Sequence, residues 1–207
     1  MLRALAVFLL ISLLPALAVA QQVEPTKPAV LIADNVFIEA DRTLVAQGNV
    51  EAFQGGTCLQ AKSIRYNEAT GGLTIEGPIV LTEGTKTLIL ADAAQLSSDM
   101  QNGILTGARL VLNQQLQLAA QQINRTDGRY SQLYKTTVTS CRICEDGRAP
   151  LWQIRAKRVV HDRVENKLYF DEAQFRILRV PVFYVPRLRL PGPGLDRATG
   201  FLVPSIR

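Results

Sequence analysis

Apolar and polar residues alternate along much of the chain, with the period of two that is typical of half-buried β-strands. In the clearest example, Trp152, Ile154 and Ala156 fall on one face of a strand, and Arg155 and Lys157 fall on the opposite face. Similar segments recur along the chain, separated by turn-forming Asn, Asp and Gly residues. The pattern therefore predicts an all-β protein built from many short antiparallel strands.

A longer period groups these strands into pairs. Copies of a two-strand unit begin near Ala33, Ala61, Ala91, Ala120 and Ala156. The first four starts are 28, 30 and 29 residues apart, and the fifth follows after 36, which indicates an insertion before it. A fixed period of this length is typical of stacked supersecondary units. We therefore expect a stack of two-strand repeats.

Four segments depart from the simple strand pattern. The window 91–100 is helix-like, but it occupies a repeat position, so we interpret it as a strand. Residues 126–150 are expected to be irregular. Residues 180–186 contain prolines that remove ladder donors, which argues against a central strand. Residues 190–194 are rich in Pro and Gly, so we expect a loop there.

The N-terminus has the features of a secretory signal peptide. Arg3 supplies a positive charge, residues 4–19 are almost wholly apolar, and small residues before Gln21 form a cleavage site. A membrane anchor is the alternative, but the apolar stretch is short and contains Pro15. We therefore expect a signal peptide over 1–20, a polar linker over 21–29, and export to a compartment where disulfides persist.

The charge of the chain is unevenly distributed. The net charge is +5, and residues 148–207 hold 12 basic and 5 acidic side chains, so this part accounts for all of the excess. Such a basic region is compatible with nucleic acid, anionic lipid or a solvated face. No nucleic-acid-binding motif accompanies it, so nucleic acid is not expected as a partner.

Candidate catalytic residues are few. The single histidine, His161, falls in a turn of a repeat, where a surface position is expected. Cys141 and Cys144 form one Cys-x-x-Cys pair without a nearby histidine, which is weak evidence for zinc or redox chemistry. A structural disulfide is the favoured interpretation, and Cys58 is left over. We expect no metal, no cofactor and no enzyme; a thiol oxidoreductase or a polysaccharide-acting solenoid is the disfavoured alternative.

The apolar strand faces suggest a binding surface. Stacked units that each have one apolar face would line a continuous apolar surface. A closed sandwich would hide this surface, whereas an open one would hold acyl chains, each buried methylene contributing about 0.8 kcal/mol. The sequence leaves both alternatives open. The candidates for the lining are Val36, Ile38, Ile64, Tyr66, Leu73, Ile75, Leu116, Leu118, Trp152, Ile154, Leu168 and Phe170.

Two stretches, together with the repeat, carry a resemblance to a known family. They are the segment Pro150–Asp162, which contains Leu-Trp-Gln-Ile-Arg-Ala, and Gly-Phe-Leu-Val-Pro-Ser at 200–205. With them the chain resembles the LPS-assembly family LptD, also called the organic solvent tolerance (OstA) family. The resemblance implies that residues 30–178 form a periplasmic, open, V-shaped β-jellyroll, and that 179–207 form a connector and the start of an outer-membrane β-barrel.

The resemblance also implies function and partners. In this family the groove receives lipopolysaccharide (LPS) from a periplasmic bridge protein, which joins by β-strand addition. The lipid then passes to a C-terminal barrel in the outer membrane, which is plugged by a lipoprotein. This barrel is absent from the sequence, so we expect a fragment or a truncated product. A stand-alone periplasmic bridge protein of the LptA/LptC type is the alternative, because the repeat alone also occurs there.

Two sets of residues gain an expected role from the resemblance. Cys141 and Cys144 are candidates for disulfides that tie the domain to the barrel, with the pairing left open. Arg187, Arg189, Arg197 and Arg207 lie where the family approaches the membrane, so they are expected either to meet anionic headgroups or to be solvated.

Overall fold

The computed structural model describes residues 28–140 and 150–193. The expected signal peptide, most of the linker, Cys141, Cys144, Arg197, Arg207 and the 200–205 stretch lie outside these ranges. The described part contains strands and no helix, so none of it is a helix long and apolar enough to cross a membrane. The strands are β1 (Val30–Ile32), β2 (Asn35–Ile38), β3 (Thr43–Gln54), β4 (Thr57–Asn67), β5 (Gly72–Glu83), β6 (Thr87–Ser97), β7 (Gly103–Leu112), β8 (Leu116–Thr126), β9 (Tyr130–Thr139), β10 (Trp152–Asp162), β11 (Lys167–Ile177) and β12 (Val180–Pro191).

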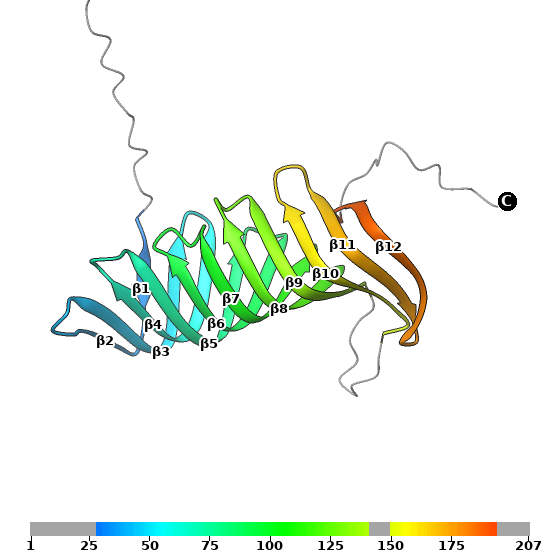
Figure 1. Ribbon diagram of the computed structural model, residues 1–207. Coiled ribbons are helices and arrows are strands. Elements are labelled where there is room, and N and C mark those ends of the chain that lie inside the picture. The colour runs from blue at the N-terminus through cyan, green and yellow to red at the C-terminus, as the bar shows by residue number, and fades with distance from the viewer. Residues whose placement is uncertain (1–27, 141–149, 194–207) are drawn as a thin grey trace, which may run out of the picture.

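The strands form one antiparallel sheet in chain order. From β3 to β12, each strand pairs with the strands before and after it, and β1 and β2 pair side by side with β3 (Figure 1). The sheet does not close on itself, so β1 and β2 form one edge and β12 forms the other. This open antiparallel β-jellyroll confirms the fold class predicted from the alternation and the repeat.

Each strand bends near its middle, and the repeated alanines mark the bend. Beside them the pairing register shifts or is interrupted, as between Gln60 and Ser63 of β4. Several facing strands hold a residue with positive φ at the same level, which is typical of a β-bulge. These residues are Asn49, Gly107, Lys135 and Glu172. The alanines themselves are buried on the inner side of the bend: Ala61, Ala91, Ala120 and Ala156.

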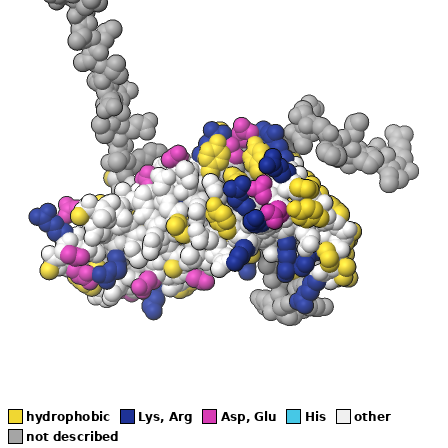
Figure 2. Space-filling model, viewed as in Figure 1, with side chains coloured by type: hydrophobic (Ala, Val, Ile, Leu, Met, Phe, Trp, Pro, Cys, Tyr) yellow, Lys and Arg dark blue, Asp and Glu magenta, His cyan; other side chains and the backbone are white. Residues whose placement is uncertain are grey.

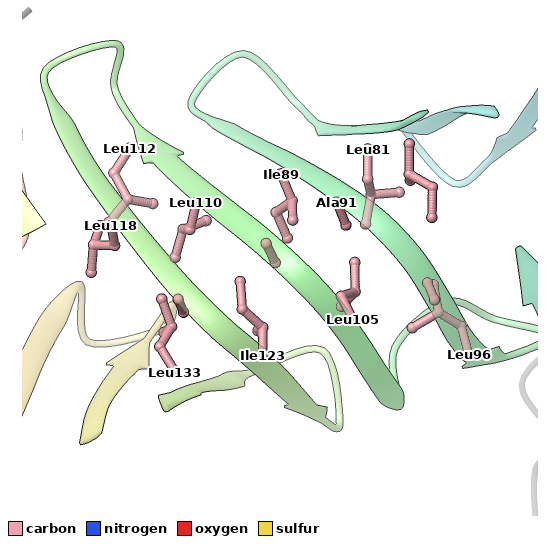
Figure 3. Close-up of a cluster of buried hydrophobic side chains, with 14 of the residues drawn as sticks. Leu81, Ile89, Ala91, Leu96, Leu105, Leu110, Leu112, Leu118, Ile123 and Leu133 are labelled. Carbon is pink, nitrogen blue, oxygen red and sulfur yellow. The ribbon is translucent and has the colours of Figure 1, made fainter. Parts of the chain in front are cut away.

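The bends fold the sheet into two arms whose inner faces pack together. Rim A consists of the turns 55–56, 84–86 and 113–115 at the ends of one arm, and rim B consists of the turns 68–71, 98–102, 127–129 and 163–166 at the ends of the other. One continuous cluster of buried hydrophobic side chains fills the space between the arms. Figure 3 shows part of this core, including Leu81, Leu110 and Ile123. The hydrophobic effect of this burial holds the two arms together.

The surface outside the core is not uniform. Hydrophobic side chains gather with Lys and Arg over the end of the molecule that carries β10 to β12 (Figure 2). Val180 and Val182, near the start of β12, are among the exposed large hydrophobic side chains. Exposed large hydrophobic side chains also occur at the opposite end of the sheet, on β1 and β2.

Polar contacts join rim A to rim B. The side chain of Glu83, at the rim A end of β5, accepts a hydrogen bond from Arg125 Nη2, and Glu83 Oε2 lies 3.3 Å from Arg163 Nη1 of rim B. Asn113 of rim A donates its Nδ2 to the carbonyl oxygen of Pro193 at 2.6 Å, and Asn166 of rim B donates to the same oxygen. The folded sheet is thus closed across its rims as well as through its core.

Two predictions about segments were wrong and two were confirmed. Residues 130–139, expected to be irregular, form β9, whose Thr and Tyr side chains hide the alternation of its buried positions. The segment 180–191 forms β12, so Leu190 and Pro191 belong to a strand and not to a loop. Strand β12 lies at the edge of the sheet, as its prolines require. The window 91–100 begins inside strand β6, as expected. The proposed boundary at residue 178 lies in the turn between two paired strands of the sheet.

His161 was expected on the surface, but it is buried. It belongs to β10, because this strand continues to Asp162 before the turn begins. Its side chain faces inward beside Leu168, its partner on β11. Burial lowers the pKa of His161 to about 4, and the charge of Arg163 acts in the same direction, whereas Asp162 and Glu83 oppose it. The imidazole is therefore neutral at neutral pH.

Asp162 holds rim B together next to this histidine. Its carboxylate accepts hydrogen bonds from Arg129 Nε and Nη2 and from the backbone N–H groups of Val164 and Glu165. The bond from Arg129 is the main cause that lowers the pKa of Asp162 to about 2. The β10–β11 turn is thus fixed by a carboxylate that stays charged through the mildly acidic range.

The bend generates a first prediction, at Gly77 of β5. A Cβ atom at this position would lie 2.3 Å from the backbone oxygen of Asp92, which no side-chain rotation can relieve. We expect Gly77→Ala to lower the free energy of unfolding by at least about 2 kcal/mol. Urea unfolding measures this, with Gly72→Ala on the same strand as the control, since Gly72 has only the Thr70 side chain nearby. Equal stability of both variants would contradict a tightly packed bend.

A second prediction concerns the pH dependence of stability. The unfolded chain protonates His161 near pH 6.5 and the folded chain only near pH 4, so the unfolded state binds more protons between these values. The free energy of unfolding should therefore fall as the pH drops from 6.5 to 4.5, with about 2 kcal/mol of this fall due to His161. His161→Gln should remove that part in urea titrations at both pH values. A variant with an unchanged pH dependence would show that the histidine is solvated.

Candidate functional site

The candidate site is the inner, apolar face of the folded sheet. The pairing registers place the twelve predicted lining residues on this face, since directly opposite residues point to the same side of a sheet. At the N-terminal end, Val36 and Ile38 lie opposite Ala46 and Leu44. Ile64 of β4 then lies opposite both Ala46 of β3 and Ile75 of β5. The alternation in the sequence thus identified the inner face.

The predicted lining residues differ strongly in exposure. Six are buried in the core: Ile64, Ile75, Leu118, Ile154, Leu168 and Phe170. Four are half-buried: Tyr66, Leu73, Leu116 and Trp152. Val36 and Ile38 are 51% and 70% exposed, because β2 lies at the edge of the sheet. The middle of the inner face is thus packed against itself, whereas its β2 end is accessible.

A mainly apolar cavity of about 230 Å³ interrupts the packing between the arms near β12. Five of the predicted residues line it, and Leu190 and Pro191 of β12 complete one wall. Cavities of about 150 Å³ with apolar walls stay dry and accept apolar ligands. This cavity can therefore take an apolar group without losing hydrogen bonds. The five predicted residues are Leu116, Trp152, Ile154, Leu168 and Phe170.

An aromatic stack leads from this cavity to the edge of the sheet. The ring centroids of Trp152 and Phe175 are 6.1 Å apart, and those of Phe175 and Phe183 are 5.0 Å apart, with nearly parallel planes. Stacked rings of this kind contribute about 0.5–1.5 kcal/mol beyond the burial of their surface. Phe183 is 53% exposed, so the stack ends in an accessible apolar surface on β12.

Sequence reasoning missed Phe175, Phe183 and Leu190. The alternation continues through Phe175, which is two residues beyond the inward-facing Ala173, so this residue could have been found. The bulge at Phe175/Arg176 breaks the pairing register of β12, and its prolines weaken the strand pattern, so Phe183 carried no clear signal.

The outer face near this end is charged and carries several ion pairs. Arg158 donates to Asp171, and Lys157 donates to Glu172 at 2.8 Å; these hydrogen bonds raise the pKa of Arg158 and of Lys157. Of the arginines expected near a membrane, Arg189 lies 5.3 Å above the ring of Tyr169. Exposed pairs of this type add little stability, so they mainly keep the outer face hydrated.

The described residues offer little reactive chemistry. They contain no group of three or more His, Cys, Asp or Glu side chains that could hold a metal ion. Within the same ranges, Cys58 is a free thiol. Burial, and secondarily the charge of Glu51, raises the pKa of Cys58, so it is not activated as a nucleophile. What the inner face can do chemically is bind apolar groups.

Comparisons with known proteins found relatives by sequence. No family model matches the chain. The LPS-assembly protein LptD of Yersinia enterocolitica is 29% identical over 177 residues, which cover 86% of this chain and 21% of the relative. The LptD of Salmonella choleraesuis is 28% identical over 194 residues, with 87% and 23% covered. The chain thus spans about a fifth of the length of these curated relatives.

A solved structure was also found. It is LptH of Pseudomonas aeruginosa, described as the LptA-homologous periplasmic component of the lipopolysaccharide transport device. It is 14% identical, covers 66% of this chain and 76% of its own, and aligns with a TM-score of 0.29, which is too low to support an argument. The sequence matches are the stronger finding: over most of its length, this chain is similar to the N-terminal part of the LPS-assembly proteins LptD.

Proposed function

We propose that this chain takes part in lipopolysaccharide transport and assembly at the outer membrane, with its inner face carrying the acyl chains. The similarity to LptD supports the substrate class, and the relatives bear the names of assembly proteins and not of enzymes. The observation that carries the proposal is the continuity of the inner face. It offers exposed aliphatic side chains at β2, an apolar cavity near β12 and an aromatic stack at the edge.

The partners follow from the two edges of the sheet. In the proposal, a periplasmic bridge protein adds a strand at the β1/β2 edge, and the lipid leaves at the β12 end toward an outer-membrane barrel with its plug lipoprotein. The β12 edge is less suited to strand addition than the β1/β2 edge, because Pro181, Pro186 and Pro191 each lack a backbone donor. β2 contains no proline. The chain would then lie in the periplasm, next to the outer membrane.

Passage of an acyl chain requires the packed interior to open. The inner face is apolar along the core, so an acyl chain can replace the contacts that the arms make with each other. Each methylene that it buries contributes about 0.8 kcal/mol. Replacing contacts between the arms with contacts to an acyl chain therefore changes the free energy little along the core. The remaining cost comes from the polar groups that join the rims.

Photo-crosslinking at matched positions tests the lipid path. Ile38 and Phe37 are neighbouring exposed residues on opposite faces of β2, and Phe183 and Tyr184 form the same kind of pair on β12. Crosslinkers at Ile38 and Phe183 should capture LPS, whereas those at Phe37 and Tyr184 should not, although all four side chains are exposed. Equal labelling of both faces would refute an inner path.

A proline on β2 tests the strand-addition edge. The N–H of Glu39 donates to the carbonyl oxygen of Thr43, so by alternation the N–H of Phe37 points at β3 and that of Val36 points outward. Val36→Pro should therefore weaken binding of the periplasmic bridge protein by about tenfold while leaving the β2–β3 hydrogen bonds in place. Pull-down from detergent-free extract measures this, and Val36→Thr, which keeps the donor, serves as the control. Undiminished capture by the proline variant would place the contact elsewhere.

A further inference from the structure

A second cavity, of about 650 Å³, lies between the rims on the polar side of the molecule. Glu83 contributes from the rim A end, and Arg125, Arg129 and Arg163 contribute from the rim B side. It lies apart from the proposed apolar path, because most of the residues that line it are polar or charged. The remaining lining residues are Gln54, Gly55, Thr57, Asp99, Met100, Gln101, Asp127, Gly128 and Val164.

Arg125 is the unusual residue of this cavity. Its side chain is only 2% exposed, although it carries a full positive charge. Its Nη2 donates to Glu83, whereas Nε and Nη1 have no hydrogen-bond partner within the described ranges. A guanidinium presents five N–H donors in a fixed plane, and leaving several of them unpaired in a buried place is costly. Arg125 thus has N–H groups left to donate to a further acceptor.

The charges around Arg125 leave a positive excess. Glu83 is the one carboxylate that pairs with both Arg125 and Arg163. Arg129 is neutralised by its paired hydrogen bonds to Asp162. His161 is neutral at neutral pH. Two guanidinium groups therefore share one carboxylate at the inner end of the cavity.

Two further carboxylates, those of Asp99 and Asp127, also line the cavity. Asp99 is exposed and its Oδ1 accepts hydrogen bonds from Ser97 Oγ and from the N–H of Gln101 within its own turn. Asp127 is exposed on the β8–β9 turn. Exposed carboxylates are screened by water and salt, so they do not cancel the charge at the buried end.

We propose that Arg125 and Arg163 form a binding site for a phosphate-type anion, and that the Glu83 carboxylate holds its place when no such anion is bound. A phosphate group offers several acceptor oxygens, and guanidinium groups bind such oxygens in pairs. With Glu83 displaced, it could satisfy the buried Nε and Nη1 of Arg125 together with Arg163. In its present place Glu83 leaves both of these donors, and its own Oε2, without a hydrogen bond in the part of the chain that the structure describes. Because Glu83 comes from the rim A end and Arg163 from rim B, displacing Glu83 would also break a contact that closes the rims.

The anion has two possible sources with the same chemistry. One is the phosphorylated sugar headgroup of a glycolipid whose acyl chains occupy the inner face, and this version rests on the function proposed above. The other is free phosphate, which requires no lipid at all. Arg125 and Arg163 would bind the phosphate group of either source in the same way. The experiment therefore compares free phosphate with a phosphorylated lipid.

Calorimetric titration of the 207-residue chain with inorganic phosphate and with dispersed diphosphoryl lipid A tests the site. Glu83→Gln removes the competing charge while keeping an amide of similar shape, so it should tighten binding of an anionic probe by about tenfold. Arg125→Gln alone would leave Glu83 buried with fewer partners and could unfold the chain. The double variant Glu83→Gln/Arg125→Gln avoids this and should lose the binding. Arg65→Gln, which breaks the distant exposed pair with Glu39, is the control and should change nothing.

The outcomes separate this inference from the proposed function. Loss of phosphate binding in the double variant supports the site, and a further loss of diphosphoryl but not dephosphorylated lipid A identifies the headgroup as the source. Phosphate binding without any lipid binding would keep the site and overturn the lipid function. If lipid A binds equally well with and without its phosphates, and equally well to the double variant, the anion site is refuted and the lipid function is kept. Binding of neither probe overturns both.

Discussion

The two arms of this sheet can pack together only if every strand bends sharply, and at the bend the side chains must be small. Ala61, Ala91, Ala120 and Ala156 occupy the inner side of the bend and are buried. At Gly77 even a methyl group would meet the backbone of the neighbouring strand. The core between the arms, the approach of the two rims and the cavities at their borders all depend on this line of small residues. The repeated alanine in the sequence is therefore a requirement of packing and not only a mark of repetition.

The sequence predicted the inner face better than it predicted the bend. A strand exposes one set of alternating residues to the core, so Ile64 and Ile75 could be assigned by parity alone. A bulge shifts this parity within a strand, which is why Ala61 and Ile64, three residues apart, both face inward. His161 was misplaced because a strand boundary is set by where pairing stops, and here pairing continues to Asp162. Phe183 follows a bulge and lies among prolines. Its contact with Phe175 therefore depends on how the strands pair and could not be predicted from the local sequence pattern.

The core and the rims hold the arms together by different means. Along the core, apolar side chains pack with apolar side chains, and the contacts are non-directional. At the rims, the buried pair of Glu83 and Arg125 loses hydration and leaves part of its hydrogen-bonding capacity unmet among the described residues. A buried ion pair of this kind contributes little net stability, because desolvation offsets the attraction between the charges. The core therefore contributes most of the free energy that holds the arms together, whereas the rims contribute directional contacts that fix how the arms meet.

The two edges of the sheet have different chemistry, and this gives the molecule a direction. The β2 edge has outward-pointing backbone donors and flexible aliphatic side chains, Val36 and Ile38, on its inner face. The β12 edge has prolines in place of several donors and ends in the stacked ring of Phe183. A second sheet can extend the first edge by hydrogen bonding, whereas the prolines remove some of the backbone donors of the second edge. If copies or relatives of this fold associate in a row, the prolines of β12 would weaken strand pairing at that edge, because Pro181, Pro186 and Pro191 donate no backbone hydrogen bond.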